Sequence, residues 1–115
     1  MKKVKKILIN SALSFATTIV VLFLWRNSIL AAMLIFCIGV ISLFVLKEKK
    51  YTLIYIIVGI LGPAAEIFAI NFGVWSYAKS DFLGIPYWLP FVWAQTGTYI
   101  SSILITLNYF VKKKK

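Results

Sequence analysis

One carboxylate of this chain, Glu66, stands deep inside a long apolar run, three residues after Pro63. If that run crosses a membrane, the charged form of Glu66 costs several kcal/mol, which favours the protonated acid unless a cation or donors hold the charge. A protonated acid can give a proton to an apolar substrate, and an exchanging one can couple proton flow to transport. The alternative is a structural role, in which Glu66 hydrogen-bonds a neighbouring helix and contributes about 1 kcal/mol or less. Glu66 is therefore the candidate catalytic residue.

The first expected partner of Glu66 is Gln95. On helical rise, Glu66 lies about 13 Å below Trp75 and Gln95 about 10 Å below Trp88, at similar depths of two antiparallel helices. We therefore expect Glu66 and Gln95 to form a hydrogen bond between these helices. Asn71 lies about 140° around the helix from Glu66, so it joins the site only if the chain bends there. The candidate binding residues are Gln95, Asn71, Trp75, Tyr77 and Trp93.

The sequence offers little for metals or cofactors. It contains no histidine and one cysteine, Cys37, which excludes an intramolecular disulfide and leaves no ordinary ligand set for zinc or an iron–sulfur cluster. Neither glycine-rich nucleotide-binding motif is present. We therefore predict no metal and no cofactor.

The elements that position these residues are four apolar runs, each near the roughly 20 residues needed to cross the hydrocarbon core. The chain is 62% hydrophobic and 14% charged, whereas about a quarter of a soluble domain is charged. The expected spans are residues 7–24, 29–46, 51–75 and 87–111, joined by two tight connections and one outer loop, 78–85. The sequence therefore predicts an all-α membrane protein, a four-transmembrane-helix bundle that forms one domain over residues 1–115, with no soluble domain.

The lysines predict the orientation of this bundle. The formal net charge is +10, but the lysines occur in short clusters between apolar runs, which argues against nucleic acid as a partner. Eleven positive charges fall on the side of the two termini and the 47–50 connection, against two on the opposite side, Arg26 and Lys79. The positive-inside rule then places both termini in the cytoplasm and the chain in the plasma (inner) membrane as a multi-pass protein.

A stretch of 33 residues, 62–94, resembles part of a known enzyme group. "GPAAEIFAINFGVWSYAKSDFLGIPYWLPFVWA" is similar to integral-membrane carotenoid-biosynthesis proteins of the hydratase and lycopene-cyclase-like groups. The matching positions are Glu66, Phe72, Gly73, Trp75, Tyr77, Leu83, Gly84, Pro86, Pro90 and Trp93. The resemblance implies an embedded carboxylate, here Glu66, that donates protons to double bonds of long isoprenoids.

This chain also departs from the carotenoid-biosynthesis pattern. The hydratases are longer and have more spans, and the cyclases carry an acidic pair where Pro63-Ala-Ala-Glu66 supplies one carboxylate. The same glycine, proline and tryptophan arrangement is equally similar to small membrane families to which no function is assigned.

Two other classes of function remain open. Four spans and one membrane glutamate also describe small proton-coupled exporters of apolar solutes that act as homo-oligomers, although there the glutamate is on the first span. A structural or accessory membrane subunit without catalysis is the third reading. A four-span bundle has little interior volume, so we expect any pocket for an apolar or isoprenoid ligand to be completed by a second copy or a partner membrane subunit. The remaining partner is the lipid bilayer.

Overall fold

The computed structural model describes residues 2–114, and four helices account for most of them. They are α1 (Lys3–Leu24), α2 (Ser28–Leu46), α3 (Lys49–Asn71) and α4 (Leu89–Lys114). Within residues 2–114 there is no strand, and one isolated bridge pairs Phe82 with Ile85. The predicted all-α fold with four helices is therefore confirmed.

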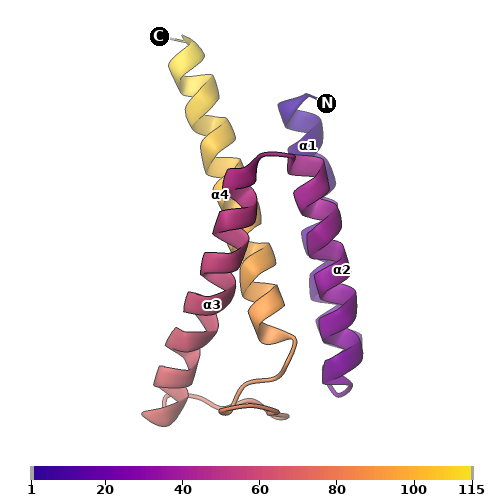
Figure 1. Cartoon of the computed structure of the whole chain (residues 1–115), viewed down its shortest axis with the longest axis vertical. Coiled ribbons are helices and arrows are strands. Elements are labelled where there is room, and N and C mark those ends of the chain that lie inside the picture. The colour runs from indigo at the N-terminus through magenta and orange to yellow at the C-terminus, as the bar shows by residue number, and fades with distance from the viewer. Residues whose placement is uncertain (1, 115) are drawn as a thin grey trace.

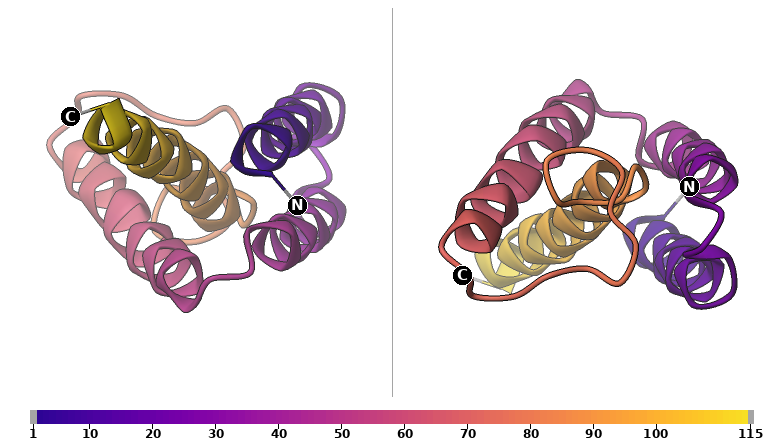
Figure 2. Two further views of the ribbon diagram at one scale, coloured as in Figure 1. Left: turned by 90° about the horizontal axis from the view of Figure 1, so that it is seen from above. Right: turned by 90° about the horizontal axis from the view of Figure 1, so that it is seen from below.

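The helices run up and down along one long axis. The two termini and the α2–α3 connection lie at one end, and the segment 72–88 between α3 and α4 crosses the other end (Figure 1). Viewed along the axis, α4 lies between the α1–α2 hairpin and α3 (Figure 2). The molecule measures 48 × 27 × 20 Å, and its long dimension is close to the 40–45 Å of a bilayer with its headgroups.

The third helix ends earlier than the sequence suggested. α3 covers Lys49–Asn71, so the helix ends about four residues before the expected end of the span, at about residue 75. Gly73 adopts a left-handed φ of 77°, its N–H donates to the Ile70 carbonyl, and the Val74 N–H donates to the Ala69 carbonyl. This Schellman motif closes the helix, because a glycine pays no steric cost for the left-handed conformation that stops it.

The fourth helix begins later than expected, at Leu89 rather than Tyr87. Pro90 lies in its first turn, where the missing proline N–H breaks no helical hydrogen bond. The early end of α3 and the late start of α4 lengthen the intervening loop from the expected 78–85 to residues 72–88. At the opposite end, α1 and α4 extend beyond the expected 7–24 and 87–111, as far as Lys3 and Lys114.

Polar groups are concentrated in the interior and large apolar side chains on the exterior. The buried polar side chains are Asn10, Thr17, Ser28, Ser42, Glu66, Gln95, Thr98 and Ser102. Large apolar residues lie exposed along all four helices, for example Phe15, Phe23, Phe44 and Leu104. This distribution reverses that of a water-soluble domain, in which charged and polar residues are mostly exposed.

Three helices, α1, α2 and α3, are long and apolar enough to cross a membrane. α4 has 26 residues and is the longest, but one face carries the buried Gln95, Thr98 and Ser102, and its last turn carries lysines. Its lower hydropathy therefore comes from its inward face and its basic end.

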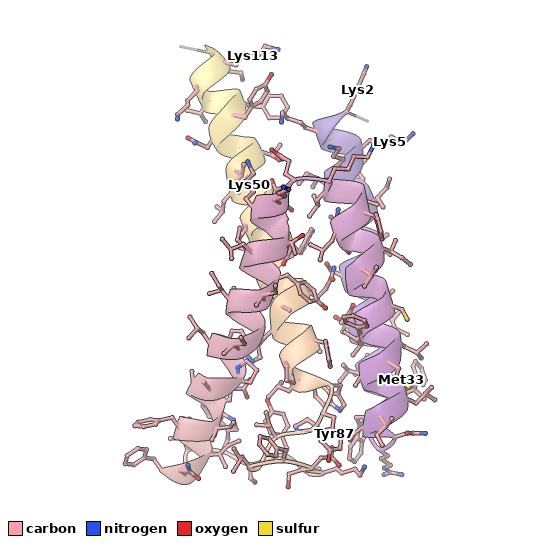
Figure 3. All side chains as sticks on the ribbon, viewed as in Figure 1. Lys2, Lys5, Met33, Lys50, Tyr87 and Lys113 are labelled. Atoms are coloured by element: carbon pink, nitrogen blue, oxygen red, sulfur yellow. The ribbon has the colours of Figure 1, made fainter. Side chains whose placement is uncertain are left out.

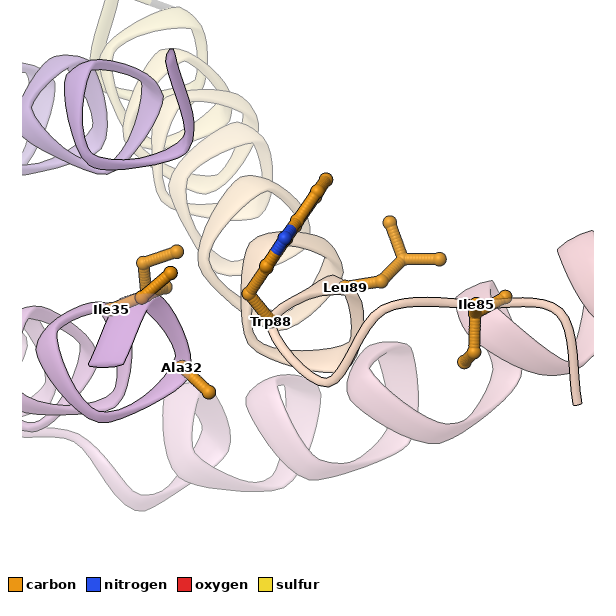
Figure 4. Packing of buried hydrophobic residues seen from close by; sticks show 6 residues of the cluster. Ala32, Ile35, Ile85, Trp88 and Leu89 are labelled. Carbon is orange, nitrogen blue, oxygen red and sulfur yellow. The ribbon is translucent and has the colours of Figure 1, made fainter. Parts of the chain in front are cut away.

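A small hydrophobic core closes the loop end of the bundle. Ala32 and Ile35 of α2 pack near Trp88 and Leu89 at the start of α4, with Ile85 of the loop alongside (Figure 4). These residues fix the path of the loop over the helix ends. The loop therefore approaches α3 from a defined direction.

Candidate functional site

Glu66 lies on α3, five residues before the helix ends, and its side chain is buried, with 8% exposed. Two donors hold its carboxylate: the Tyr77 hydroxyl donates to Oε1 and the Trp93 indole N–H donates to Oε2. An indole N–H can only donate, so Oε2 must be an acceptor in this contact. Among residues 2–114 no lysine or arginine pairs with Glu66. The carboxylate is therefore held by neutral donors from two other parts of the chain.

Close packing of α3 on α4 places Trp93 against Glu66. A Cβ at Gly62, one turn before Glu66, would overlap the Trp93 indole, so the ring occupies the space that the glycine leaves. A Cβ at Gly97 would likewise meet Val58, 2.6 Å from its Cγ1. Small residues let helix backbones approach in this way, and the approach here brings the indole N–H to the carboxylate.

Tyr77 comes from the loop, not from an extension of α3. Its ring packs edge-on against Trp88, with centroids 6.1 Å apart, and this contact aims the hydroxyl at Glu66. Burial raises the pKa of Tyr77 above its usual value, and the hydrogen bond to Glu66 and the nearby carboxylate raise the pKa further. The phenol therefore stays protonated at neutral pH, as a donor to a charged Glu66 or an acceptor from a protonated one.

A pocket of about 370 Å³ opens beside this carboxylate. Its lining residues come from α3, the loop and the first two turns of α4: Glu66, Tyr77, Trp88, Leu89, Val92, Trp93 and Thr96. The walls are mainly aromatic and aliphatic, and Glu66 is the one acid among them. The volume lies at the lower end of the range of small-molecule sites, large enough for part of a long apolar chain.

The expected hydrogen bond between Glu66 and Gln95 is not formed. Gln95 Nε2 donates instead to Ser14 Oγ of α1 at 3.1 Å and to Ser42 Oγ of α2 at 2.9 Å. Gln95 and Trp93 are two residues apart, about 200° around α4, so when Trp93 faces α3, Gln95 must face α1 and α2. Gln95 therefore joins three helices in the interior and does not contribute to the Glu66 site.

The other candidate residues separate into two groups. Tyr77 and Trp93 contact Glu66 directly. Asn71 is exposed at the last position of α3, and Trp75 is 46% exposed in the loop that follows, so neither lines the pocket. Asn71 lies within α3, about 140° around the helix from Glu66, and the helix end at Gly73 leaves Trp75 in the exposed loop.

Four of the pocket residues are not among those predicted from the sequence: Trp88, Leu89, Val92 and Thr96. The sequence does contain a signal for three of them. Leu89, Val92 and Thr96 share one helical face with Trp93, because they follow its three- and four-residue spacing.

A small polar cluster fastens the loop between α3 and α4 to α2. Lys79 Nζ lies 3.4 Å from Ser28 Oγ and 3.5 Å from Asp81 Oδ1, and the Tyr87 N–H donates to Asp81 Oδ2 at 3.2 Å. The hydrogen bond with Ser28 lowers the pKa of Asp81, and the Tyr87 N–H and Lys79 lower it further. This cluster holds the loop that carries Tyr77 over the helix ends.

Comparison with known proteins gives no relative: no protein-family model, curated protein or solved structure matches the chain. The candidate function must therefore be argued from the Glu66 site itself.

Proposed function

We propose that this chain is a multi-pass protein of the plasma (inner) membrane, with four spanning helices and both termini in the cytoplasm. Three apolar helices, a polar interior and an apolar exterior support insertion in a bilayer. α4 would span as well, because the residues that reduce its hydropathy face the other helices or lie at its basic end. The concentration of lysines at the end of the termini supports the orientation (Figure 3).

Within this framework we propose that the Glu66 pocket binds an apolar, isoprenoid-like chain and that Glu66 exchanges a proton with one of its double bonds. The observation that carries the proposal is a single buried carboxylate, held by two neutral donors, in the wall of an otherwise apolar and aromatic pocket. Such a pocket accepts hydrocarbon, and its one acid is placed to act on it.

The proposed chemistry uses each group in the pocket. Protonated Glu66 adds its proton to a carbon–carbon double bond, which leaves a carbocation on the chain and a carboxylate on the protein. The N–H of Trp93 and the O–H of Tyr77 stabilise that carboxylate, and the aromatic faces of the pocket stabilise the carbocation. Return of a proton from a neighbouring carbon to Glu66 completes an isomerisation. Addition of water to the carbocation, with loss of one of the water protons to the Glu66 carboxylate, would instead complete a hydration.

Deuterium exchange tests this proposal without knowledge of the natural product. Membranes containing the chain are incubated in D₂O with squalene or lycopene, and carbon-bound deuterium is measured by mass spectrometry. We expect incorporation with the wild-type chain and with Glu48→Gln, which removes an exposed carboxylate, and its loss with Glu66→Gln. Equal incorporation by Glu66→Gln would refute the acid–base role of Glu66.

Proton-coupled export of an apolar solute is the second candidate. It is favoured by the presence of one acid in the pocket, because a single carboxylate can bind and release a proton as solute enters and leaves. Proton release from purified protein on addition of an apolar solute, absent in Glu66→Gln, together with no deuterium incorporation, would select this candidate. Absence of both signals would leave Glu66 as a structural link between α3, the loop and α4, in an accessory membrane subunit.

A further inference from the structure

A second cavity, of about 610 Å³, lies between α2 and α3 at the end of the molecule that carries the termini. Three of its lining residues are apolar and come from α2: Val40, Leu43 and Phe44. The other two are Lys47, at the C-terminal end of α2, and Thr52, in the first turns of α3. The cavity is thus apolar along its length, with a cation and a hydroxyl at one end.

Lys47 is not neutralised by the rest of the chain. The ion pairs among residues 2–114 join Lys50 to Glu48 at 3.4 Å and Lys79 to Asp81 at 3.5 Å, and Lys47 takes part in neither. Lys49 follows two residues later, and Glu48 is paired with Lys50, so residues 47–50 (three lysines and one glutamate) keep a net charge of +2 at this end of the cavity. An occupant of this end is therefore expected to carry negative charge.

The backbone at Lys47 gives a second reason to assign its side chain a role. Lys47 closes α2 with a left-handed φ of 69°, and its N–H donates to the Leu43 carbonyl. A helix end of this kind favours glycine, because a Cβ is strained in the left-handed region. The chain has a lysine where glycine would fold more easily, and this lysine lines the cavity.

We propose that the α2–α3 cavity binds one anionic phospholipid of the inner leaflet. Its phosphate contacts the Lys47 ammonium and the Thr52 hydroxyl, and one acyl chain lies along Val40, Leu43 and Phe44. The cavity volume suits a headgroup and the first part of a single chain, and the remainder extends into the bilayer. The charged and hydroxyl groups at one end of the cavity match a lipid headgroup, and the apolar wall beyond them matches the acyl chain that follows it. The proposal rests on the membrane location proposed above and is independent of the chemistry at Glu66.

The test compares two lipids that differ in the headgroup. The full-length chain, purified in detergent, is titrated with phosphatidylglycerol or with phosphatidylcholine of the same acyl chains, and lipid retained per chain is measured by native mass spectrometry. We expect one phosphatidylglycerol per chain at concentrations at which phosphatidylcholine is not retained. Lys47→Gln should weaken phosphatidylglycerol binding about fivefold, the effect of removing one lysine contact.

Two further variants control for the loss of one charge at this end of the molecule and for the strain of the Lys47 backbone. Lys113→Gln removes the same charge at the same end of the molecule, from the last turn of α4, and should leave lipid binding unchanged. Lys47→Gly removes the charge but relieves the left-handed backbone, so it should fold at least as well and still lose the preference for phosphatidylglycerol. Equal loss in Lys113→Gln, or an unchanged preference in both Lys47 variants, would overturn the site.

Alkaline washing of the membranes before detergent extraction separates failure of the lipid site from failure of the membrane proposal. A chain recovered in the supernatant after alkaline washing of membranes is not embedded, and both proposals then fail. A chain that stays in the pellet but shows no headgroup preference overturns the lipid site alone. Cross-linking of two chains through Cys substitutions at Val40 or Phe44 would also overturn it, because a second copy would then occupy the cavity.

Discussion

At the scale of residues, the candidate site is one carboxylate and its two donors. Trp93 reaches Glu66 from α4 and Tyr77 reaches it from the loop, so three separate parts of the chain meet at a group of three atoms. Hydrogen bonds to a charged acceptor are about twice as strong as neutral ones. In the proposed reaction, the two donors would therefore stabilise the carboxylate left when a proton passes to the bound chain.

Trp93→Phe tests the importance of this stabilisation. The variant keeps an aromatic ring in the pocket wall but removes the donor to Oε2, so we expect deuterium incorporation to fall by about 100- to 1,000-fold, as for the loss of one preorganised donor. Trp25→Phe, a tryptophan next to α1 that does not contact Glu66, is the matched control. An unchanged rate in Trp93→Phe would show that the indole N–H serves the fold and not the chemistry.

At the scale of elements, the site depends on the contact between α3 and α4. The Trp93 indole packs on Gly62, so the distance between these helices and the position of the donor are set together. The loop supplies the other donor and is fastened at its far side to α2. Changes remote from Glu66 along the chain can therefore disturb its hydrogen bonds.

Gly62→Ala is expected to displace Trp93, because the added methyl group would overlap the indole. Overpacking of this kind costs about 1–3 kcal/mol, so we expect a lower midpoint of thermal unfolding in detergent together with loss of activity at Glu66. Ala65→Leu, an exposed position on the same helix, is the control and should leave both properties unchanged. A Gly62→Ala protein with normal stability would contradict the close packing of α3 on α4.

The fastening of the loop predicts a dependence on acid. The pKa of Asp81 is lowered in the folded chain, so its contribution is present above the unfolded value of about 3.9 and is lost as the pH falls through the lower, folded value. Asp81→Asn should reduce the hydrogen-exchange protection of residues 78–88 at pH 7 by about 1 kcal/mol or less, since the cluster lies at the surface. As the pH falls below about 3.9, the difference in exchange between the variant and the wild type should shrink, and a difference that does not shrink would exclude this origin.

At the scale of the whole molecule, polar residues join the helices and apolar residues face outward. Gln95 binds α1 and α2 at once, while the basic termini and the loop between α3 and α4 lie at opposite ends. Association of helices in lipid relies on such polar contacts and on small residues, because lipid chains are as apolar as the helix surfaces.

Cysteine labelling tests the proposed orientation. In a Cys37→Ala background, Ser80→Cys lies in the outer loop and Lys113→Cys near the C-terminus. We expect a membrane-impermeant thiol reagent to label Ser80→Cys in intact cells, and Lys113→Cys only after the membrane is permeabilised. Labelling of both positions, or the reverse pattern, would contradict the assignment of both termini to the cytoplasm.

The sequence by itself determined the helices and one important residue. Four apolar runs separated by short polar connections specify four helices, because each run is long enough to cross a bilayer and local spacing sets its period. Glu66 could be identified from its isolation in one of these runs. The end of α3 was also encoded locally, by Gly73. The apolar run continues past Gly73, so a helix end predicted from hydropathy alone falls too late.

Only the tertiary structure decided which groups meet. The similar depths of Glu66 and Gln95 along their helices suggested that the two side chains pair. Which face of α4 meets α3 depends on the rotation of α4 about its axis, and that rotation follows from the packing of Trp93 on Gly62. Tyr77 reaches Glu66 because the loop folds back over the helix ends, a path fixed by its contacts with α2 and Trp88. Rotation and loop path arise from contacts between residues distant in the chain, which a linear pattern does not specify.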